Sequence, residues 1–210
     1  MGALTTEDWP AALDVGCAGV PIEGEERSGD LAVFAPYPGG ALVAVIDGLG
    51  HGDPAADAAD AAAAVIREYA ADSPQHLFER CHRRLRRTRG VVMTLAWFDL
   101  DERRLRWVGV GNVEARLLRA TVGPAARYSS APSPLVLGGV VGYQLPRAIR
   151  AGALELGPGD AVAFATDGVA ADYSAVLDPA LDPQAQAERV LDAHGKGSDD
   201  ALAVVVRWRG

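Results

Sequence analysis

Acidic residues stand at the ends of three apolar runs in this sequence, in positions that suit metal binding. The runs cover residues 41–46, 161–166 and 201–206, and the acidic residues beside them are Asp47, Asp167, Asp199 and Asp200. Apolar runs of this length predict buried strands, so these carboxylates lie at strand ends. Glycine follows Asp47, which leaves the backbone free to approach an ion. The pattern predicts a site for a hard divalent cation, with ligands from Asp47, Gly48, Asp167 and Asp199.

The chemistry expected of such a site is hydrolysis of a phosphate ester. Two ions that share Asp47 would hold a water molecule that loses a proton near neutral pH and acts as the nucleophile. The same ions would stabilise negative charge on the phosphoryl group. A single Asp-Gly pair is also typical of a turn, so the prediction depends on the recurrence of carboxylates at three strand ends.

The elements that must position these residues are predicted from periodicity and turn composition. We expect strands at 13–22, 31–35, 41–46, 91–99, 105–110, 113–119, 148–154, 160–166 and 201–208. Helices are expected at 55–71, 73–87 and 183–193, with Asp53 as the N-cap of the first. Residues 31–46 should form a hairpin, 91–119 a meander, and 148–166 a strand pair around the turn 157–159. This order favours an α+β domain over alternating βαβ units.

Several motifs together resemble one known family. They are Ser28-Gly29-Asp30, Asp47-Gly48-Leu49-Gly50-His51-Gly52, Gly111-Asn112, Thr166-Asp167-Gly168 and Ser198-Asp199-Asp200. The chain resembles the bacterial metal-dependent serine/threonine phosphatases of the type 2C superfamily, in the SpoIIE and RsbX branch, and is most similar to the RsbX type. The resemblance implies one domain over residues 1–210, folded as a four-layer α/β/β/α sandwich of two antiparallel sheets flanked by helices.

The resemblance also implies an activity, a cofactor and a partner. Relatives of this type remove phosphate from phosphoserine or phosphothreonine, with Mn2+ or Mg2+ as cofactor, and two ions are expected. The implied substrate is a phosphorylated STAS-domain or stressosome-type protein. A catalytically silent binding module that docks on a signalling scaffold or kinase, and a hydrolase of small phosphate esters, remain as alternatives.

Residue roles follow from the same resemblance. Asp47 matches the ligand that bridges the ions, Gly48 the carbonyl ligand, and Asp167 and Asp199 the other carboxylate ligands. Asp30 matches an acidic residue that acts near the metals through water, while Asp200 ranks below its neighbour as a ligand.

Leu49 stands where eukaryotic relatives carry a histidine that assists the leaving group. His51 is therefore a further catalytic candidate, unless it caps the following helix or lies in solvent. Arg27 is a candidate for binding the substrate phosphate.

Composition limits the remaining classes of function. The chain has 210 residues and a formal net charge of -8, which argues against nucleic-acid binding. No apolar run is long enough to span a membrane and no secretion signal is recognisable, so we expect a cytoplasmic location. The sequence does not reveal the oligomeric state, and a monomer is the default expectation. Cys17 and Cys81 lack a CxxC spacing, and no disulfide or zinc site is expected.

The basic stretch 80–89 is either a solvated helix face or a docking surface for an acidic or phosphorylated partner.

Overall fold

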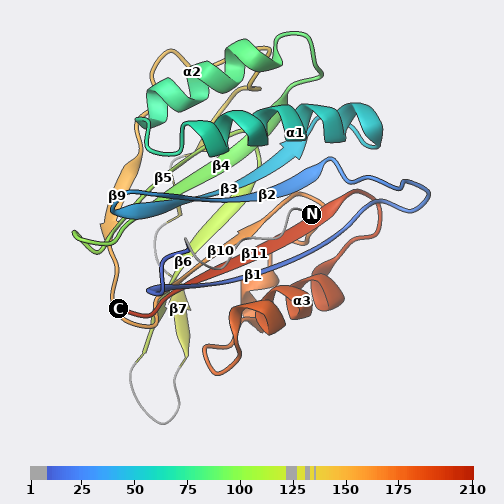
Figure 1. Cartoon of the computed structure of the whole chain (residues 1–210). Coiled ribbons are helices and arrows are strands. Elements are labelled where there is room, and N and C mark those ends of the chain that lie inside the picture. Colours follow the sequence, from blue (N-terminus) through green and yellow to red (C-terminus); the bar gives the residue numbers. More distant parts are fainter. Residues whose placement is uncertain (1–8, 122–126, 131–132, 135) are drawn as a thin grey trace.

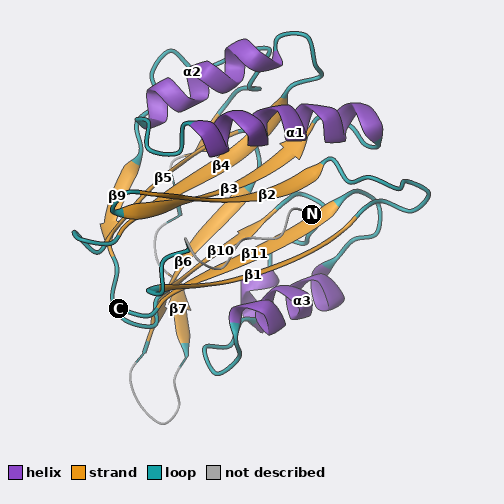
Figure 2. Cartoon of the chain, viewed as in Figure 1, coloured by secondary structure: helices purple, strands orange, loops and turns teal. Residues whose placement is uncertain are grey.

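Two β-sheets pack face to face, and helices cover their outer faces (Figure 1). The computed structural model describes residues 9–121, 127–130, 133–134 and 136–210. Helices α1 (Asp53–Glu68) and α2 (Pro74–Leu85) lie over one sheet, and α3 (Pro183–His194) lies over the other, next to the 3-10 turn η1 (Tyr173–Val176) (Figure 2). The predicted α+β sandwich in four layers is confirmed.

The sheet under α1 and α2 has the strand order β2-β3-β4-β5-β8, with β9 also paired to β5. Its strands are β2 (Asp30–Tyr37), β3 (Gly40–Gly48), β4 (Val91–Asp99), β5 (Arg104–Val110), β8 (Val136–Leu137) and β9 (Gly152–Glu155). All of these pairs are antiparallel except β5 with β8. The predicted hairpin of β2 and β3 is confirmed, and its register places Asp30 opposite Asp47.

The second sheet has the order β1-β11-β10-β6-β7 and is antiparallel throughout. Its strands are β1 (Leu13–Val20), β11 (Ala201–Trp208), β10 (Ala161–Ala165), β6 (Glu114–Ala120) and β7 (Tyr128–Ser130). Both β3 and β11 are covered on two faces, which explains why each reads as a continuous apolar run. Alanines on the inner face of α1 allow that helix to approach the first sheet closely.

Two predicted strand pairings are wrong. Strand β6 does not continue a meander with β5, because the chain crosses to the second sheet at Gly111-Asn112. Strands β9 and β10 also belong to different sheets. The turn between them is held by Asp160, whose carboxylate accepts the N–H groups of Gly157 (2.8 Å) and Ala120 (3.1 Å). The Asp160 carboxylate thus fixes the point where the chain crosses from one sheet to the other. The composition of residues 157–159 is the same as that of a hairpin turn, so it could not predict this crossing.

The predicted N-cap of α1 is also wrong. Gly52 is the N-cap of α1, with a φ of 69°, and Asp53 is the first helical residue. A left-handed glycine turns the chain sharply into the helix, so Asp53 acts in the first turn, where a carboxylate favours the helix dipole. Ser73 caps α2 by accepting the N–H of His76 (3.4 Å).

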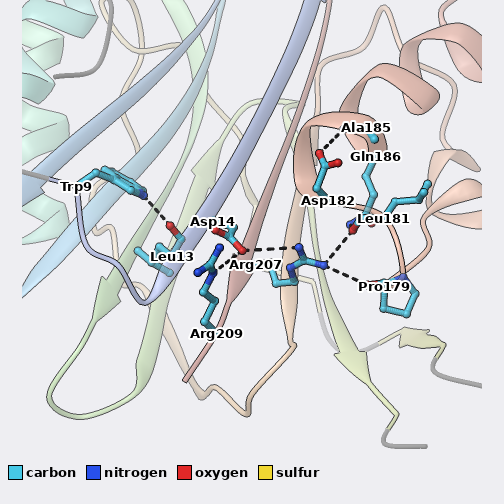
Figure 3. Close-up of polar contacts among 10 residues, drawn as sticks. All are labelled: Trp9, Leu13, Asp14, Pro179, Leu181, Asp182, Ala185, Gln186, Arg207 and Arg209. Atoms are coloured by element: carbon cyan, nitrogen blue, oxygen red, sulfur yellow. Dashed lines mark hydrogen bonds and ion pairs between the residues drawn. The ribbon is translucent and has the colours of Figure 1, made fainter. Parts of the chain in front are cut away.

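Polar contacts fix α3 against the second sheet (Figure 3). Arg207 of β11 donates to the carbonyls of Pro179 (3.1 Å) and Leu181 (2.9 Å), just before the helix begins. Asp14 of β1 pairs with Arg207 (3.7 Å) and more closely with Arg209 (2.6 Å). These contacts tie β1, β11 and the start of α3 together.

Both cysteines are free, with Cys81 buried and Cys17 partly buried. Among the helices that the structure describes, none combines the length and apolar character needed to cross a bilayer.

Candidate metal centre

Three of the predicted ligands meet at one edge of the sandwich. Asp47 lies at the end of β3, Asp167 follows β10, and Asp199 precedes β11. Because β10 and β11 are antiparallel neighbours, the end of one and the start of the other share an edge, and the first sheet brings β3 over it. The three aspartates line one pocket of about 380 Å³, together with His51 and Asn112. The sequence pattern therefore predicted the convergence correctly.

Glycines at this edge allow close backbone approach. A β-carbon on Gly48 would overlap the carbonyl of Ala55 in α1, and a β-carbon on Gly168 would overlap the carbonyl of Asp200. Gly48 also donates its N–H to the carbonyl of Gly29 (3.0 Å). Both Asp-Gly pairs therefore require glycine for packing at the site, in addition to any contact that the backbone makes with an ion.

The neighbours Asp199 and Asp200 have different surroundings. Asp200 is buried, and its two carboxylate oxygens accept the N–H groups of Ile22 (2.8 Å) and Gly29 (2.7 Å). Asp199 lines the pocket, and its Oδ1 accepts the N–H of Asp200 (2.9 Å). Asp200 thus holds the segment before β2, while Asp199 faces the pocket.

Asp30 is buried behind the pocket. The hydroxyl of Thr166 donates to Oδ2 of Asp30 (2.6 Å) and accepts the N–H of Leu202 (2.9 Å). This hydroxyl links the two sheets at the site, and sequence reasoning missed it. The available signal was a threonine directly before the Asp167-Gly168 pair.

Two further polar residues contact Asp167. The amide of Asn112 donates to Oδ2 of Asp167 (2.8 Å), and the ammonium of Lys196 donates to its carbonyl (2.6 Å). Gly111-Asn112 was one of the motifs of the family resemblance, and the structure places both residues at the pocket. Lys196, the single lysine of the chain, was not predicted.

Crowded carboxylates make this edge electrostatically unfavourable without a cation. Burial raises the pKa of Asp30 to about 8, the Thr166 hydrogen bond opposes this, and repulsion from Asp47 adds to it. Burial likewise raises the pKa of Asp47 to about 7, with further repulsion from Asp167 and Asp199. A bound cation would relieve this repulsion.

The donor set fits a hard divalent ion. Within the described ranges, no three histidine, cysteine, aspartate or glutamate side chains come together closely enough to hold one ion in common. The pocket offers carboxylate oxygens from different strands, which suits Mg2+ or Mn2+ because such ions keep several water ligands. Asp47, Gly48, Asp167 and Asp199 remain the predicted ligands.

His51 and Arg27, the other two candidates, lie near the site in different ways. His51 lines the pocket, and its Nδ1 lies 2.8 Å from Oε1 of Glu25. It does not cap α1, which has no side-chain cap. The guanidinium of Arg27 instead pairs with three aspartates on the exposed side of α1, namely Asp53, Asp57 and Asp60. Arg27 is therefore engaged by the helix.

Comparison with known proteins identifies the class. The family model of Stage II sporulation protein E (SpoIIE) matches residues 37–209. The chain belongs to the SpoIIE family, and its fold is that of the type 2C phosphatases. The family resemblance drawn from the motifs is thus confirmed.

Individual relatives refine the comparison. The chain is 28% identical over 91 residues to phosphoserine phosphatase RsbX of Bacillus subtilis (strain 168), which covers 43% of this chain and 46% of that protein. The matched part thus spans about half the length of this curated relative.

Among solved structures, one is 27% identical to this chain, with a TM-score of 0.82. It comes from work on the bacterial stressosome as a modular system that has been adapted to control secondary messenger signalling. The match covers 93% of this chain and 99% of the chain in that structure. RsbX in complex with magnesium has 20% identity and a TM-score of 0.77, over 95% and 97% of the two chains.

Proposed function

We propose that this chain is a Mg2+- or Mn2+-dependent phosphatase that acts on phosphoserine or phosphothreonine of stress-signalling proteins. The observation that carries the proposal is the convergence of Asp47, Asp167 and Asp199 in one pocket from three separate strand ends. Membership of the SpoIIE family and the magnesium complex of RsbX support the metal-dependent activity. Residues 1–210 would act as one phosphatase domain.

The proposed substrate is a phosphorylated STAS-domain or stressosome-type protein in the cytoplasm. Two relatives support this substrate class: a curated phosphoserine phosphatase, and a structure from work on the stressosome. The pocket is open to solvent at exposed His51, so a phosphorylated side chain on a protein surface can enter it.

Each polar residue of the pocket has a proposed task. Asp47, Asp167, Asp199 and the carbonyl of Gly48 would hold two ions, which supply an activated water and stabilise phosphoryl charge. Asn112 orients the carboxylate of Asp167 through its hydrogen bond. Asp30 would act through water, and Thr166 fixes its orientation.

The proton required by the leaving serine or threonine oxygen needs a donor at the pocket. Leu49 lines the pocket and is apolar, so it cannot donate a proton. His51 carries a titratable ring at the pocket, and Glu25 orients that ring through Nδ1. We propose His51 as the donor, in competition with water.

Turnover with a matched ligand variant tests the function. Purified protein would be given p-nitrophenyl phosphate and a phosphoserine peptide, with Mn2+ or with EDTA. We expect metal-dependent phosphate release that is at least 100-fold lower in Asp47→Asn, an order-of-magnitude expectation for a lost metal ligand. Release that is no faster than in Asp47→Asn would sink the proposal. If calorimetry detects no binding of divalent cations but stable binding of a partner protein, the chain would instead be a catalytically silent binding module.

A further inference from the structure

A basic surface begins at the rim of the pocket and continues along the end of α2. It consists of Arg83, Arg84, Arg86, Arg87 and Arg89, which we call the arginine surface. All five side chains are exposed. None of them forms an ion pair or hydrogen bond with a residue that the structure describes. In a chain with a net charge of -8, five unpaired cations within seven positions form a local reversal of charge.

Contacts with the metal-binding loop connect this surface to the pocket. Gly50 lines the pocket, and a β-carbon built there would overlap Nη1 of Arg89. Leu49 donates its N–H to the carbonyl of Gly90 (3.1 Å), which holds the two segments side by side. In Figure 1 the C-terminal end of α2 and the start of α1 lie at the same end of the sandwich. The guanidinium of Arg89 thus lies next to the place where a substrate phosphate would enter.

A second segment packs on the end of α2 and reaches the pocket. Gly142 donates its N–H to Nδ1 of His82 (3.0 Å), and a β-carbon there would lie 2.9 Å from Cβ of Leu85. Val140, two residues before, lines the pocket, while Tyr143 is 84% exposed. The end of α2 is therefore joined to the pocket rim through packed residues.

Helix stability explains only part of this charge. Arg83 and Arg84 lie in the last turn of α2, where cations favour the helix dipole. Arg86, Arg87 and Arg89 lie at or beyond the helix end, so the dipole does not account for all of them. Arg80, by contrast, is engaged by Asp72 (2.7 Å) and by the ring of Tyr69. Arg80, which lies farther from the pocket, is thus paired, whereas the arginines of the arginine surface, which lie nearer the pocket, are not.

We propose that the arginine surface docks an acidic segment of the protein substrate, next to the phosphorylated residue. The proposal deepens the proposed function and rests on it, since it assigns substrate selection to residues outside the metal centre. Clusters of cations beside a site raise the encounter rate with an anionic partner in a salt-dependent way. Acidic residues that flank the phosphoserine should therefore lower KM, whereas a small phosphate ester should not distinguish wild type from surface variants.

Two synthetic phosphoserine peptides of equal length test the proposal, one flanked by Asp and Glu and the other by Asn and Gln. The test variant replaces Arg83, Arg84, Arg86 and Arg87 with Gln. The control variant replaces four exposed arginines elsewhere in the chain with Gln, namely Arg67, Arg104, Arg127 and Arg189. Both variants change the net charge equally. p-Nitrophenyl phosphate reports the metal centre alone.

We expect wild type to prefer the acidic peptide by roughly tenfold in kcat/KM at low salt, through KM, with the preference falling as salt rises. The test variant should lose this preference and keep its turnover of p-nitrophenyl phosphate, while the control variant keeps both. No preference in wild type, or an undiminished preference in the test variant, would overturn the docking surface. If the quadruple variant does not fold, the pair Arg86→Glu and Arg87→Glu serves instead.

Failure of the proposed function is distinguishable from failure of docking. If wild type hydrolyses none of the three substrates, fluorescence anisotropy of the labelled acidic peptide measures binding directly. Tighter binding to wild type and control than to the test variant would uphold the arginine surface without catalysis. Equal binding to all three proteins would refute it.

Discussion

Substitution of the adjacent Asp199 and Asp200 separates metal binding from folding. Asp200 accepts two backbone N–H groups with its buried carboxylate, at 2.8 and 2.7 Å. Hydrogen bonds to a charged group contribute about 1.5–3 kcal/mol each. Asp200→Ala should therefore lower the free energy of unfolding of the metal-free protein by about 3–5 kcal/mol, since lost repulsion with nearby carboxylates offsets a part.

Asp199→Asn should have the opposite profile. Its side chain keeps a carbonyl oxygen that can accept the N–H of Asp200, so metal-free stability should change by less than about 0.5 kcal/mol. At a Mn2+ concentration of about 100 times the wild-type Kd, binding stabilises wild type by about 2.7 kcal/mol. A Kd weakened by about 100-fold would leave only about 0.4 kcal/mol of that stabilisation.

Urea unfolding with EDTA and with Mn2+, monitored by circular dichroism, measures both quantities for each variant. Asp200→Ala should start from lower stability but gain nearly the full increment from Mn2+, whereas Asp199→Asn should gain almost none. The reverse outcome would refute the ligand assignment: a full Mn2+ increment in Asp199→Asn, with none in an otherwise stable Asp200→Ala. Asp200→Asn, which keeps one acceptor, should fall between wild type and Asp200→Ala in EDTA.

Three other perturbations test the geometry around the pocket. Gly48→Ala should cost about 1–3 kcal/mol and abolish metal-dependent turnover, because its β-carbon overlaps a carbonyl of α1. Gly138→Ala, with no atom within 4 Å of its β-carbon, should change neither urea midpoint nor turnover. Thr166→Val should cost about 1–3 kcal/mol in a urea melt, since it leaves a buried N–H unpaired; an unchanged midpoint would contradict the link between sheets. In EDTA, stability should fall from pH 5 to 8, because the pKa of Asp30, raised to about 8, favours its protonated form in the native state. Asp30→Asn should make the free energy of unfolding depend less on pH. A wild-type stability that rises from pH 5 to 8 would contradict the raised pKa of Asp30.

The limits of several strands and the meeting of three aspartates in one pocket could be predicted from the sequence. Strands β4 and β11 were predicted at 91–99 and 201–208, and the structure has the same limits. Both are buried almost throughout, so their composition is apolar without interruption and sharply bounded. The aspartates at strand ends were recognisable because a carboxylate next to a buried run is unusual unless something binds it.

The pairing of strands across the two layers could not be predicted in the same way. Gly111-Asn112 and the turn 157–159 have the composition of hairpin turns, yet at both the chain crosses between sheets. The contacts that decide this are distant in sequence, such as Asp160 with Ala120, 40 residues apart. The Thr166 hydroxyl and the Asp30 carboxylate are 136 residues apart. Local patterns carry no information about such partners.

The same crossings explain why the pocket depends on both sheets at once. Asp47 comes from the first sheet, whereas Asp167 and Asp199 come from the second, and Thr166 joins the layers through Asp30. Repulsion among these carboxylates opposes the approach of the layers at this edge, and the apolar core between the sheets opposes their separation. A cation held by Asp47, Asp167 and Asp199, as proposed, would offset that repulsion. If the proposed ions bind, metal binding and packing of the sandwich would therefore be thermodynamically linked, and substitutions in the core between the sheets should weaken ion affinity even where they touch no ligand.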